Sequence, residues 1–288
     1  MIALLITVGG FAGTYAYDLW SAEARMREER TTQTTIDQAG PPFTNTVAYD
    51  TSLPESFTVV LDRPLTTEQV EELGALDHVG AWGLLEALGG RLIPDSLTTG
   101  HLTPPGGWSW EEPGTAARVG AAVFTMTLMS ARSSQVSIVD MDPVNVSCAE
   151  PAATTVVEFP TAGEATYPGV IVDLTHEDPV LLISDEGLEQ GQPYFDRRRI
   201  DLGGGLEPGG LRVEAVTAGQ TCEWELRARY VDARENSREV VLRDGEAPFV
   251  VEAPPERPEQ YWVMEVGPQP VRAVACHETP DAVGCPNL

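Results

Sequence analysis

The sequence predicts a mainly β protein: an N-terminal transmembrane helix, a small mixed α/β segment, and then an immunoglobulin-like antiparallel β-sandwich. Three observations predict this class. The first 20 residues are apolar almost without interruption. After about residue 117, short runs of alternating apolar and polar residues follow one another, separated by turn residues. One of these runs places Trp224 on the same face as Cys222, although Trp224 follows the second cysteine instead of standing between the two.

The segment 1–20 has the length of a membrane-spanning helix, which needs about 20 mainly apolar residues. Trp20 and the two tyrosines of this segment suit the interfacial belt of a bilayer. No basic residue precedes the apolar run, whereas a secretory signal peptide has a basic start. The triplet Ala22-Glu23-Ala24 nevertheless resembles a cleavage site, so both a retained anchor and a removed signal stay open.

The orientation of this span has two solutions. Arg25, Arg27 and Arg30 all follow the span, and the positive-inside rule would place the rest of the chain in the cytoplasm. A basic leader upstream of Met1 would restore the outward orientation. The cysteines of the chain favour the outward orientation.

The four cysteines, Cys148, Cys222, Cys276 and Cys285, predict two disulfides, since an even number beside an export-like segment is typical of an oxidising compartment. Four cysteines allow three pairings. Cys276–Cys285 is the natural local pair, and it leaves Cys148–Cys222 to cross-link the main domain. A zinc site is the alternative, but no C-x-x-C spacing occurs and His277 is the only nearby imidazole. We therefore expect the soluble part to be extracytoplasmic.

The chain is strongly acidic, and this limits its partners. All 18 basic residues are arginine, 44 residues are acidic, and the formal net charge is −26. Such a field repels phosphate backbones, so we expect no nucleic-acid binding. The field would attract cationic partners, but its simplest role is to keep a surface protein soluble.

The predicted organisation has five parts, which differ in composition and in the period of their apolar residues. These parts are a transmembrane or signal segment at 1–20, a helical stalk and linker at 21–56, a small mixed α/β region at 57–116, a β-sandwich at 117–254, and a C-terminal strand with a disulfide-closed tail at 255–288.

Individual elements follow from local patterns. Phe57–Leu61 reads as a strand, and a capping box from Thr66 to Gln69 opens a helix. Cys222–Tyr230 is the clearest strand, with an apolar face that points Cys222 into the core, where a cysteine on a facing strand could reach it. The pair Asp244-Gly245 predicts a two-residue hairpin between its flanking apolar runs.

The latter half of the chain is similar to extracytoplasmic domains of uncharacterised, membrane-anchored actinobacterial proteins. The resemblance is carried by Cys148, by Thr221-Cys222-Glu223-Trp224-Glu225-Leu226 and by the run into Gly245–Phe249, and it covers residues 117–252. It implies a single anchor followed by a β-rich outer domain, and it implies no activity.

Two groups of side chains are candidates for a binding surface. Arg197, Arg198 and Arg199 form the only basic run and follow two aromatic residues, so an anionic glycan or partner could dock there; neutralising nearby acids is the alternative. Trp108 and Trp110 stand among Pro and Gly and could form an exposed platform for sugars or peptides. They could equally fill the joint between two lobes.

Catalytic and cofactor motifs do not stand out. The chain has no G-x-S-x-G elbow, Walker loop or H-E-x-x-H helix, and we expect no cofactor. The histidines are widely separated. Asp140, Asp142 and Asp173 could hold calcium if they converge, because oxygen ligands suit that ion, but chance clusters are common in so acidic a chain.

These patterns lead to three hypotheses. The preferred one is a non-catalytic, single-pass membrane-anchored protein whose outer domain binds an envelope protein or polymer. The second is a surface or secreted hydrolase that acts through pairs of carboxylates. The third is a cytoplasm-facing regulator held by the same helix. The sequence does not indicate an oligomeric state.

Overall fold

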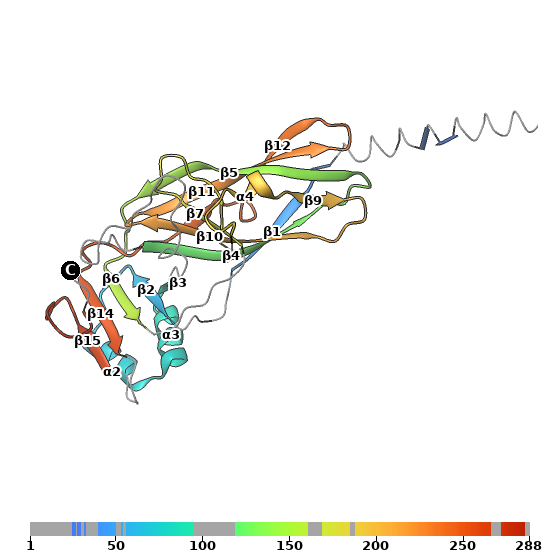
Figure 1. Cartoon of the computed structure of the whole chain (residues 1–288). Helices are drawn as coiled ribbons and strands as arrows, with labels where there is room; N and C mark the ends of the chain where they lie inside the picture. Colours follow the sequence, from blue (N-terminus) through green and yellow to red (C-terminus); the bar gives the residue numbers. More distant parts are fainter. Residues whose placement is uncertain are drawn as a thin grey trace, which may run out of the picture.

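The computed structural model describes most of the chain after residue 40. The described residues are 25, 26, 28, 29, 32, 40–49, 53, 56–94, 119–160, 169–184, 188–265 and 272–285. Their strands form three sheets of five strands each, so the described chain is mainly β, as predicted (Figure 1). No helix among them is long and apolar enough to cross a bilayer, and the predicted span at residues 1–20 lies outside them.

Two of the sheets lie face to face and form what we call the sandwich lobe. Sheet 1 has the order β1-β4-β10-β7-β8; its strands are Thr44–Tyr49, Val119–Met129, Gly209–Ala218, Val170–Asp173 and Leu182–Ile183. Sheet 2 has the order β12-β11-β5-β9, with β13 also paired to β11; its strands are Ser237–Leu242, Thr221–Asp232, Gln135–Ala149, Ile200–Gly203 and Phe249–Val251.

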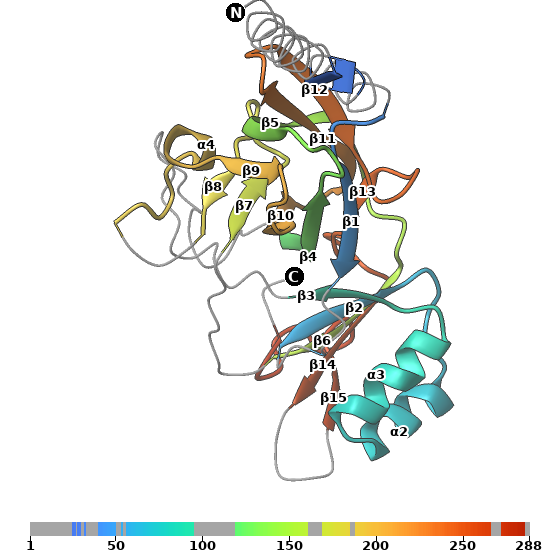
Figure 2. The ribbon, with the colours of Figure 1, turned by 90° about the vertical axis from the view of Figure 1, so that its right-hand side faces the viewer.

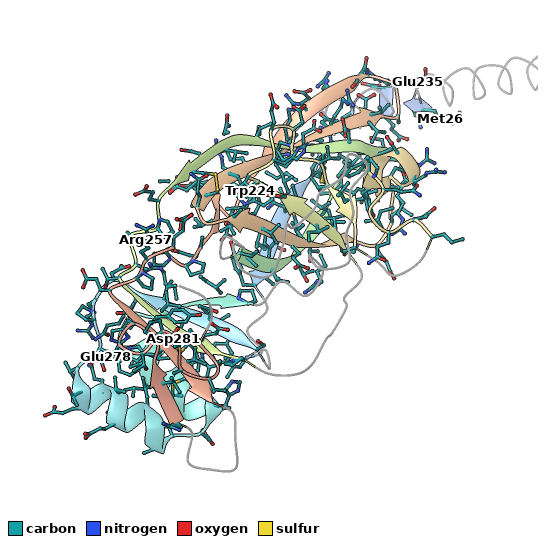
Figure 3. All side chains as sticks on the ribbon, turned by 60° about the vertical axis from the view of Figure 1, so that its left-hand side comes forward. Met26, Trp224, Glu235, Arg257, Glu278 and Asp281 are labelled. Atoms are coloured by element: carbon teal, nitrogen blue, oxygen red, sulfur yellow. A yellow bond between two sulfur atoms is a disulfide. The ribbon has the colours of Figure 1, made fainter. Side chains whose placement is uncertain are left out.

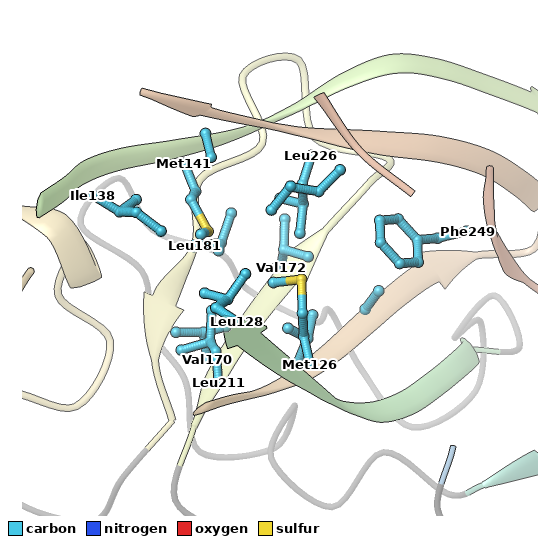
Figure 4. Packing of buried hydrophobic residues seen from close by; sticks show 14 of the residues in the cluster. Met126, Leu128, Ile138, Met141, Val170, Val172, Leu181, Leu211, Leu226 and Phe249 are labelled. Carbon is cyan, nitrogen blue, oxygen red and sulfur yellow. The ribbon is translucent and has the colours of Figure 1, made fainter. Parts of the chain in front are cut away.

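Inward-facing residues of both sheets share one hydrophobic core. Met126 and Leu128 of sheet 1 point toward Leu226 and Phe249 of sheet 2 (Figure 4). Trp224 is 0 % exposed, and its ring centroid lies 5.1 Å from that of Phe249. Buried residues alternate with less buried ones from Phe124 to the end of β4 and, except at the buried Glu225, from Cys222 to Tyr230 on β11, which confirms the predicted period of two over these stretches.

Two features of the sandwich lobe differ from the antiparallel, immunoglobulin-like expectation. Strand β7 runs parallel to β10, with Val170 opposite Val213, so sheet 1 is mixed. Cys148 and Cys222 form a disulfide, as expected, but they lie directly opposite each other on the neighbouring strands β5 and β11. This disulfide therefore cross-links one sheet, and core packing holds the two sheets together.

The predicted turn at Asp244-Gly245 forms, but the predicted hairpin around it is wrong. The backbones of Asp244 and Ala247 exchange hydrogen bonds of 3.0 and 3.1 Å, and Gly245 has a φ of 62°. The flanking strands β12 and β13 both pair antiparallel with β11 and do not pair with each other. The turn therefore links two strands that pair with β11, and it does not close a hairpin. The same tight turn is compatible with both arrangements, so the turn residues alone do not distinguish them.

Strand β1, Thr44–Tyr49, occupies a segment that the sequence predicts as linker. It pairs with β4 at the edge of sheet 1, and four of its six side chains are exposed. An edge strand has only one neighbour and needs few apolar residues, so its sequence signal is weak.

The third sheet and two helices form the small lobe. Sheet 3 has the order β15-β14-β6-β2-β3; its strands are Arg272–Ala275, Gln260–Glu265, Thr155–Phe159, Phe57–Leu61 and Arg91–Pro94. Helices α2, Thr67–Ala75, and α3, His78–Ala87, lie against one face of this sheet (Figure 2). The other face packs against the loop that the second disulfide, Cys276–Cys285, closes.

The capping box predicted for α2 is confirmed. The Gln69 N–H donates to Thr66 Oγ1 at 3.3 Å, and the Thr66 N–H donates to Gln69 Oε1 at 2.9 Å. Buried Leu73 on α2 and Leu85 on α3 then face the sheet. Local chemistry therefore starts the helix, and burial of these leucines holds it on the sheet.

The chain passes repeatedly between the two lobes. Strands β2 and β3 come from one stretch of the sequence, β6 from a second, and β14 and β15 from a third. Between them the chain builds β4 and β5, and then all strands from β7 to β13, in the sandwich lobe. Each lobe is therefore discontinuous in sequence.

Candidate functional site

The arginine run lies at the end of a one-turn helix, α4, Tyr194–Arg197. Arg198 ends that helix; its Nη2 atom lies 3.2 Å from Glu189 Oε2, and its guanidinium lies 5.5 Å from the ring centroid of Tyr194. Arg199 Nε lies 3.5 Å from Asp201 Oδ2. Arg197 is exposed. Acids therefore neutralise two of the three guanidinium groups, and the run does not form one continuous basic patch.

The two tryptophans of the predicted platform, Trp108 and Trp110, lie outside the described residues. Their role as a binding surface stays a prediction.

The three aspartates considered for calcium lie in two different sheets. Asp140 and Asp142 are on β5 and form ion pairs with Arg229 and Arg227 of β11; the Asp142–Arg227 distance is 3.0 Å. Asp173 is on β7, where its Oδ1 atom accepts hydrogen bonds from the backbone and hydroxyl of Thr175 at 2.8 and 2.6 Å. No group of three or more His, Cys, Asp or Glu side chains within the described parts of the chain could hold a metal ion.

The outward side of sheet 2 carries rows of charged side chains, and we call it the charged face. Arg229 lies between Asp140 of β5 and Glu239 of β12, because all three occupy one row across the sheet. In the next row Arg227 lies beside Asp142. Opposite charges placed directly across neighbouring strands stabilise each other. The sequence predicts the β11 side of this face, since Arg227 and Arg229 alternate with its apolar residues.

A second polar cluster lies where a shift in the pairing of β5 and β11 interrupts the charged face. Glu225 is only 8 % exposed; it accepts a hydrogen bond from Asn145 Nδ2 at 2.5 Å and forms an ion pair with Arg243. Asn145 has a φ of 53°, and the pairing register of β5 and β11 shifts between Glu223 and Glu225. The hydrogen bond from Asn145 and the ion pair with Arg243 lower the pKa of Glu225 below its ordinary value.

This cluster also ties the two sheets together at one side of the sandwich lobe. Asn45 of β1 donates from Nδ2 to the backbone oxygen of Arg243 at 2.7 Å. Tyr49 of β1 faces Asp244, and burial together with that carboxylate raises the pKa of Tyr49 to about 12. The sequence does not predict this cluster, because its residues come together only where three strands that are distant in the chain meet.

Arg91 on β3 connects the two lobes. Its guanidinium makes two hydrogen bonds to Asp62, of 3.0 and 2.8 Å, within the small lobe. Its Nε atom lies 2.8 Å from Glu252, which follows β13 of the sandwich lobe. Asp62 raises the pKa of Arg91, and Arg91 lowers the pKa of Asp62. The arginine is therefore held charged at the junction of the lobes.

The histidines have separate roles. His176 is exposed at a loop tip, where its Nδ1 atom accepts from the Asp178 N–H at 3.2 Å. His277 accepts from the Tyr261 N–H at 3.2 Å and so fastens the disulfide loop to β14. His78 is the first residue of α3 and packs against two stacked aromatic rings of sheet 3. His101 lies outside the described residues.

No protein-family model, no curated protein and no solved structure matches this chain. The resemblance of residues 117–252 to outer domains of actinobacterial membrane-anchored proteins therefore stays a prediction.

Proposed function

We propose that this chain is a single-pass membrane-anchored protein whose outer part is a non-catalytic binding module of the cell envelope. The observation that carries the proposal is the state of the cysteines. All four are paired, as Cys148–Cys222 and Cys276–Cys285, and none is free. Disulfides persist in oxidising compartments and are rare in the cytosol. The apolar segment 1–20 is the proposed anchor.

The proposed module is an immunoglobulin-like sandwich with a small accessory lobe. Trp224, two residues from the disulfide-bonded Cys222, is buried against Phe249, which supports the likeness. The parallel pairing of β7 and β10 sets this sandwich apart from a purely antiparallel one.

The charged face is the proposed binding surface. It lies on β5 and β11, which have 15 and 12 residues, so it is long and carries charges in fixed positions. The side chains of Arg227 and Arg229 are 43 % and 50 % exposed, which leaves each guanidinium open to a partner. Rigid, already paired charges lose little entropy on binding and give specificity to a polar envelope polymer or protein.

The location is tested by mapping thiols in the native membrane fraction with an alkylating reagent, followed by non-reducing peptide mass spectrometry. Linked peptides for both disulfides, together with digestion of the protein by protease added to intact cells, are the expected result. Cys148→Ser is the control, because it frees Cys222 for alkylation. Four free thiols and protection from external protease would contradict the outward orientation.

The binding surface is tested by cosedimentation of the full-length, detergent-solubilised protein with isolated cell-wall material. The double variant Arg229→Gln with Asp140→Asn removes one ion pair of the charged face while keeping both side chains polar. We expect it to bind less than the natural protein. Arg257→Gln is the matched control, since Arg257 is exposed at the junction of the lobes, away from this face (Figure 3). Equal binding by both variants would exclude the charged face.

A further inference from the structure

His78 holds helix α3 on sheet 3 through an aromatic contact. Its ring centroid lies 4.8 Å from that of Phe57 on β2 and 5.3 Å from that of Phe159 on β6. The two phenylalanine rings stack on each other at 4.5 Å and are 0 % and 1 % exposed. On the same helix, Trp82 packs edge-on against Phe57 at 6.4 Å. The imidazole therefore completes the apolar contact between the helical layer and the sheet.

The environment of His78 suits a neutral ring. Its Nε2 atom is buried and has no hydrogen-bond partner in the described structure. A protonated imidazole would place an N–H donor there without an acceptor, which is costly for a buried charged group. His78 is also the first residue of α3, at the positive end of the helix dipole, which further disfavours a cation.

One carboxylate opposes this effect. Asp77, the N-cap of α3, raises the pKa of His78, but its side chain is engaged with the Gly80 N–H at 2.8 Å. Burial is the larger influence, and the pKa of His78 is lowered from its ordinary value of 6.5.

The other elements around His78 bring no charge to its ring in the described structure. Strands β2 and β6 present Phe57 and Phe159 to it. Glu158, the neighbour of Phe159, forms a hydrogen bond with the Tyr261 hydroxyl in the part of sheet 3 that faces away from the helices. On α2, the carboxylates of Glu68, Glu71 and Glu72 are exposed to solvent.

We propose that His78 is an acid sensor that keeps the helical layer of the small lobe docked on sheet 3 while neutral and releases it when protonated. The contact with Phe57 and Phe159 is the element that opens. Its opening would bare these two buried rings and the face of α3 that carries Leu85. This device does not depend on where the protein is located or on what it binds.

The direction of the response follows from proton linkage. In the released form His78 has its ordinary pKa of about 6.5, and in the docked form the pKa is lower. Between these two values the released form binds a proton and the docked form does not, so a fall in pH through this window favours release. For one proton, the opening equilibrium rises by at most about tenfold per pH unit. Below the lowered pKa both forms are protonated and the effect saturates.

Hydrogen exchange of the full-length protein in detergent, followed by mass spectrometry at pH 7.5 and pH 5.5, tests this. After correction for intrinsic exchange rates, peptides from α2 and α3 should lose protection at pH 5.5, while peptides from β11 keep theirs. In His78→Phe the ring contact remains and the proton site is gone, so protection should be the same at both pH values. His176→Gln, which changes an exposed histidine, should behave like the natural protein.

A second measurement keeps the test decisive if His78→Phe does not fold. Exchange of the imidazole C2 hydrogen, measured by mass spectrometry, gives the titration midpoint of His78 in the natural protein. A midpoint clearly below 6.5 supports the sensor, and a midpoint at or above 6.5 overturns it. Equal loss of protection in the natural protein and in His78→Phe, or unchanged protection of α2 and α3 in acid, would also overturn it.

Discussion

Glu225 is a residue whose neighbours favour its charged form. It accepts from Asn145 and pairs with Arg243 at the irregularity between β5 and β11, while being only 8 % exposed. Removing its charge leaves the guanidinium without its anion and weakens the hydrogen bond from Asn145. The same cluster joins β1 to sheet 2 through the backbone oxygen of Arg243. We therefore expect this carboxylate to stabilise the side of the sandwich lobe where β1 meets sheet 2.

We predict that Glu225→Gln lowers the urea midpoint of unfolding at pH 7, whereas Glu223→Gln, at an exposed position on the same strand, leaves it nearly unchanged. The pKa of Glu225 is lowered in the folded state from its ordinary value of 4.5. Its stabilising contribution is therefore present above about pH 4.5 and is lost as the pH falls through the lowered pKa. Urea titrations at pH 7 and pH 3 check this. A difference between Glu225→Gln and the natural protein that does not shrink in acid would contradict the assignment.

At the scale of elements, β4 passes very close to the segment that leaves β13. A Cβ atom at Gly120 would lie 2.2 Å from the backbone oxygen of Glu252, 2.7 Å from Cα of Ala253 and 2.7 Å from Thr217 Oγ1. Two of these atoms belong to the backbone and cannot turn aside. Only glycine permits this approach of the two chains.

Gly120→Ala should therefore destabilise the protein by about 1–3 kcal/mol, the usual cost of forcing extra atoms into a packed site. Gly210→Ala on the neighbouring β10 is the control. No atom lies within 4 Å of a Cβ placed there, so the change should be within about 1 kcal/mol of neutral. Free energies of unfolding from urea titrations decide between the two. Equal effects would show that the close approach at Gly120 relaxes without cost.

Elements whose signal is local could be predicted from the sequence. The capping box of α2 and the two faces of β11 are examples, because each depends on residues a few positions apart. The hairpin at Asp244-Gly245 was predicted wrongly, since the turn chemistry is local but the partner of a strand is not. The parallel pairing of β7 with β10 was missed for the same reason.

The same limit applies to the candidate sites. The pairing of Cys276 with Cys285 was predictable from their short separation, and the pairing of Cys148 with Cys222 followed. His78 could have been found only by knowing that Phe57 and Phe159, which are far apart in the sequence, lie on neighbouring strands. No spacing rule brings these residues together.

At the scale of the whole molecule, the two disulfides close loops of very different length. Cys148 and Cys222 are 74 residues apart, and Cys276 and Cys285 are 9 residues apart. A longer closed loop removes more conformational entropy from the unfolded chain. We predict a loss of roughly 4–5 kcal/mol for Cys148→Ser with Cys222→Ser, and of about 2.5 kcal/mol for Cys276→Ser with Cys285→Ser.

Urea unfolding of the two double variants checks this order. A smaller loss for the long loop than for the short one would show that strain in the folded state, or structure in the unfolded state, outweighs the entropy of the loop.

The junction of the lobes gives a further prediction at this scale. Arg91 and Glu252 form the described ion pair across the junction, and their side chains are 35 % and 26 % exposed. A double-mutant cycle with Arg91→Gln and Glu252→Gln should give a coupling energy of about 0.2–1 kcal/mol that shrinks in 1 M salt. Asp62→Asn in place of Glu252→Gln is the comparison, because Asp62 binds the same arginine within one lobe. Coupling that salt leaves unchanged would indicate a contact sealed from solvent.

The discontinuous small lobe has a consequence for how the protein is made. Strands β2 and β3 and the helices between them leave the ribosome early, and β6 follows, but β14 and β15 lie at residues 260–275 of 288. Strand β6 pairs with β2 on one side and with β14 on the other, so one of its edges stays unpaired until β14, about 100 residues further along the chain, has been synthesised. An open edge beside buried aromatic residues invites wrong partners. A nascent chain stalled before residue 260 would therefore need a chaperone to protect that edge, although most of its sandwich strands would already have been synthesised.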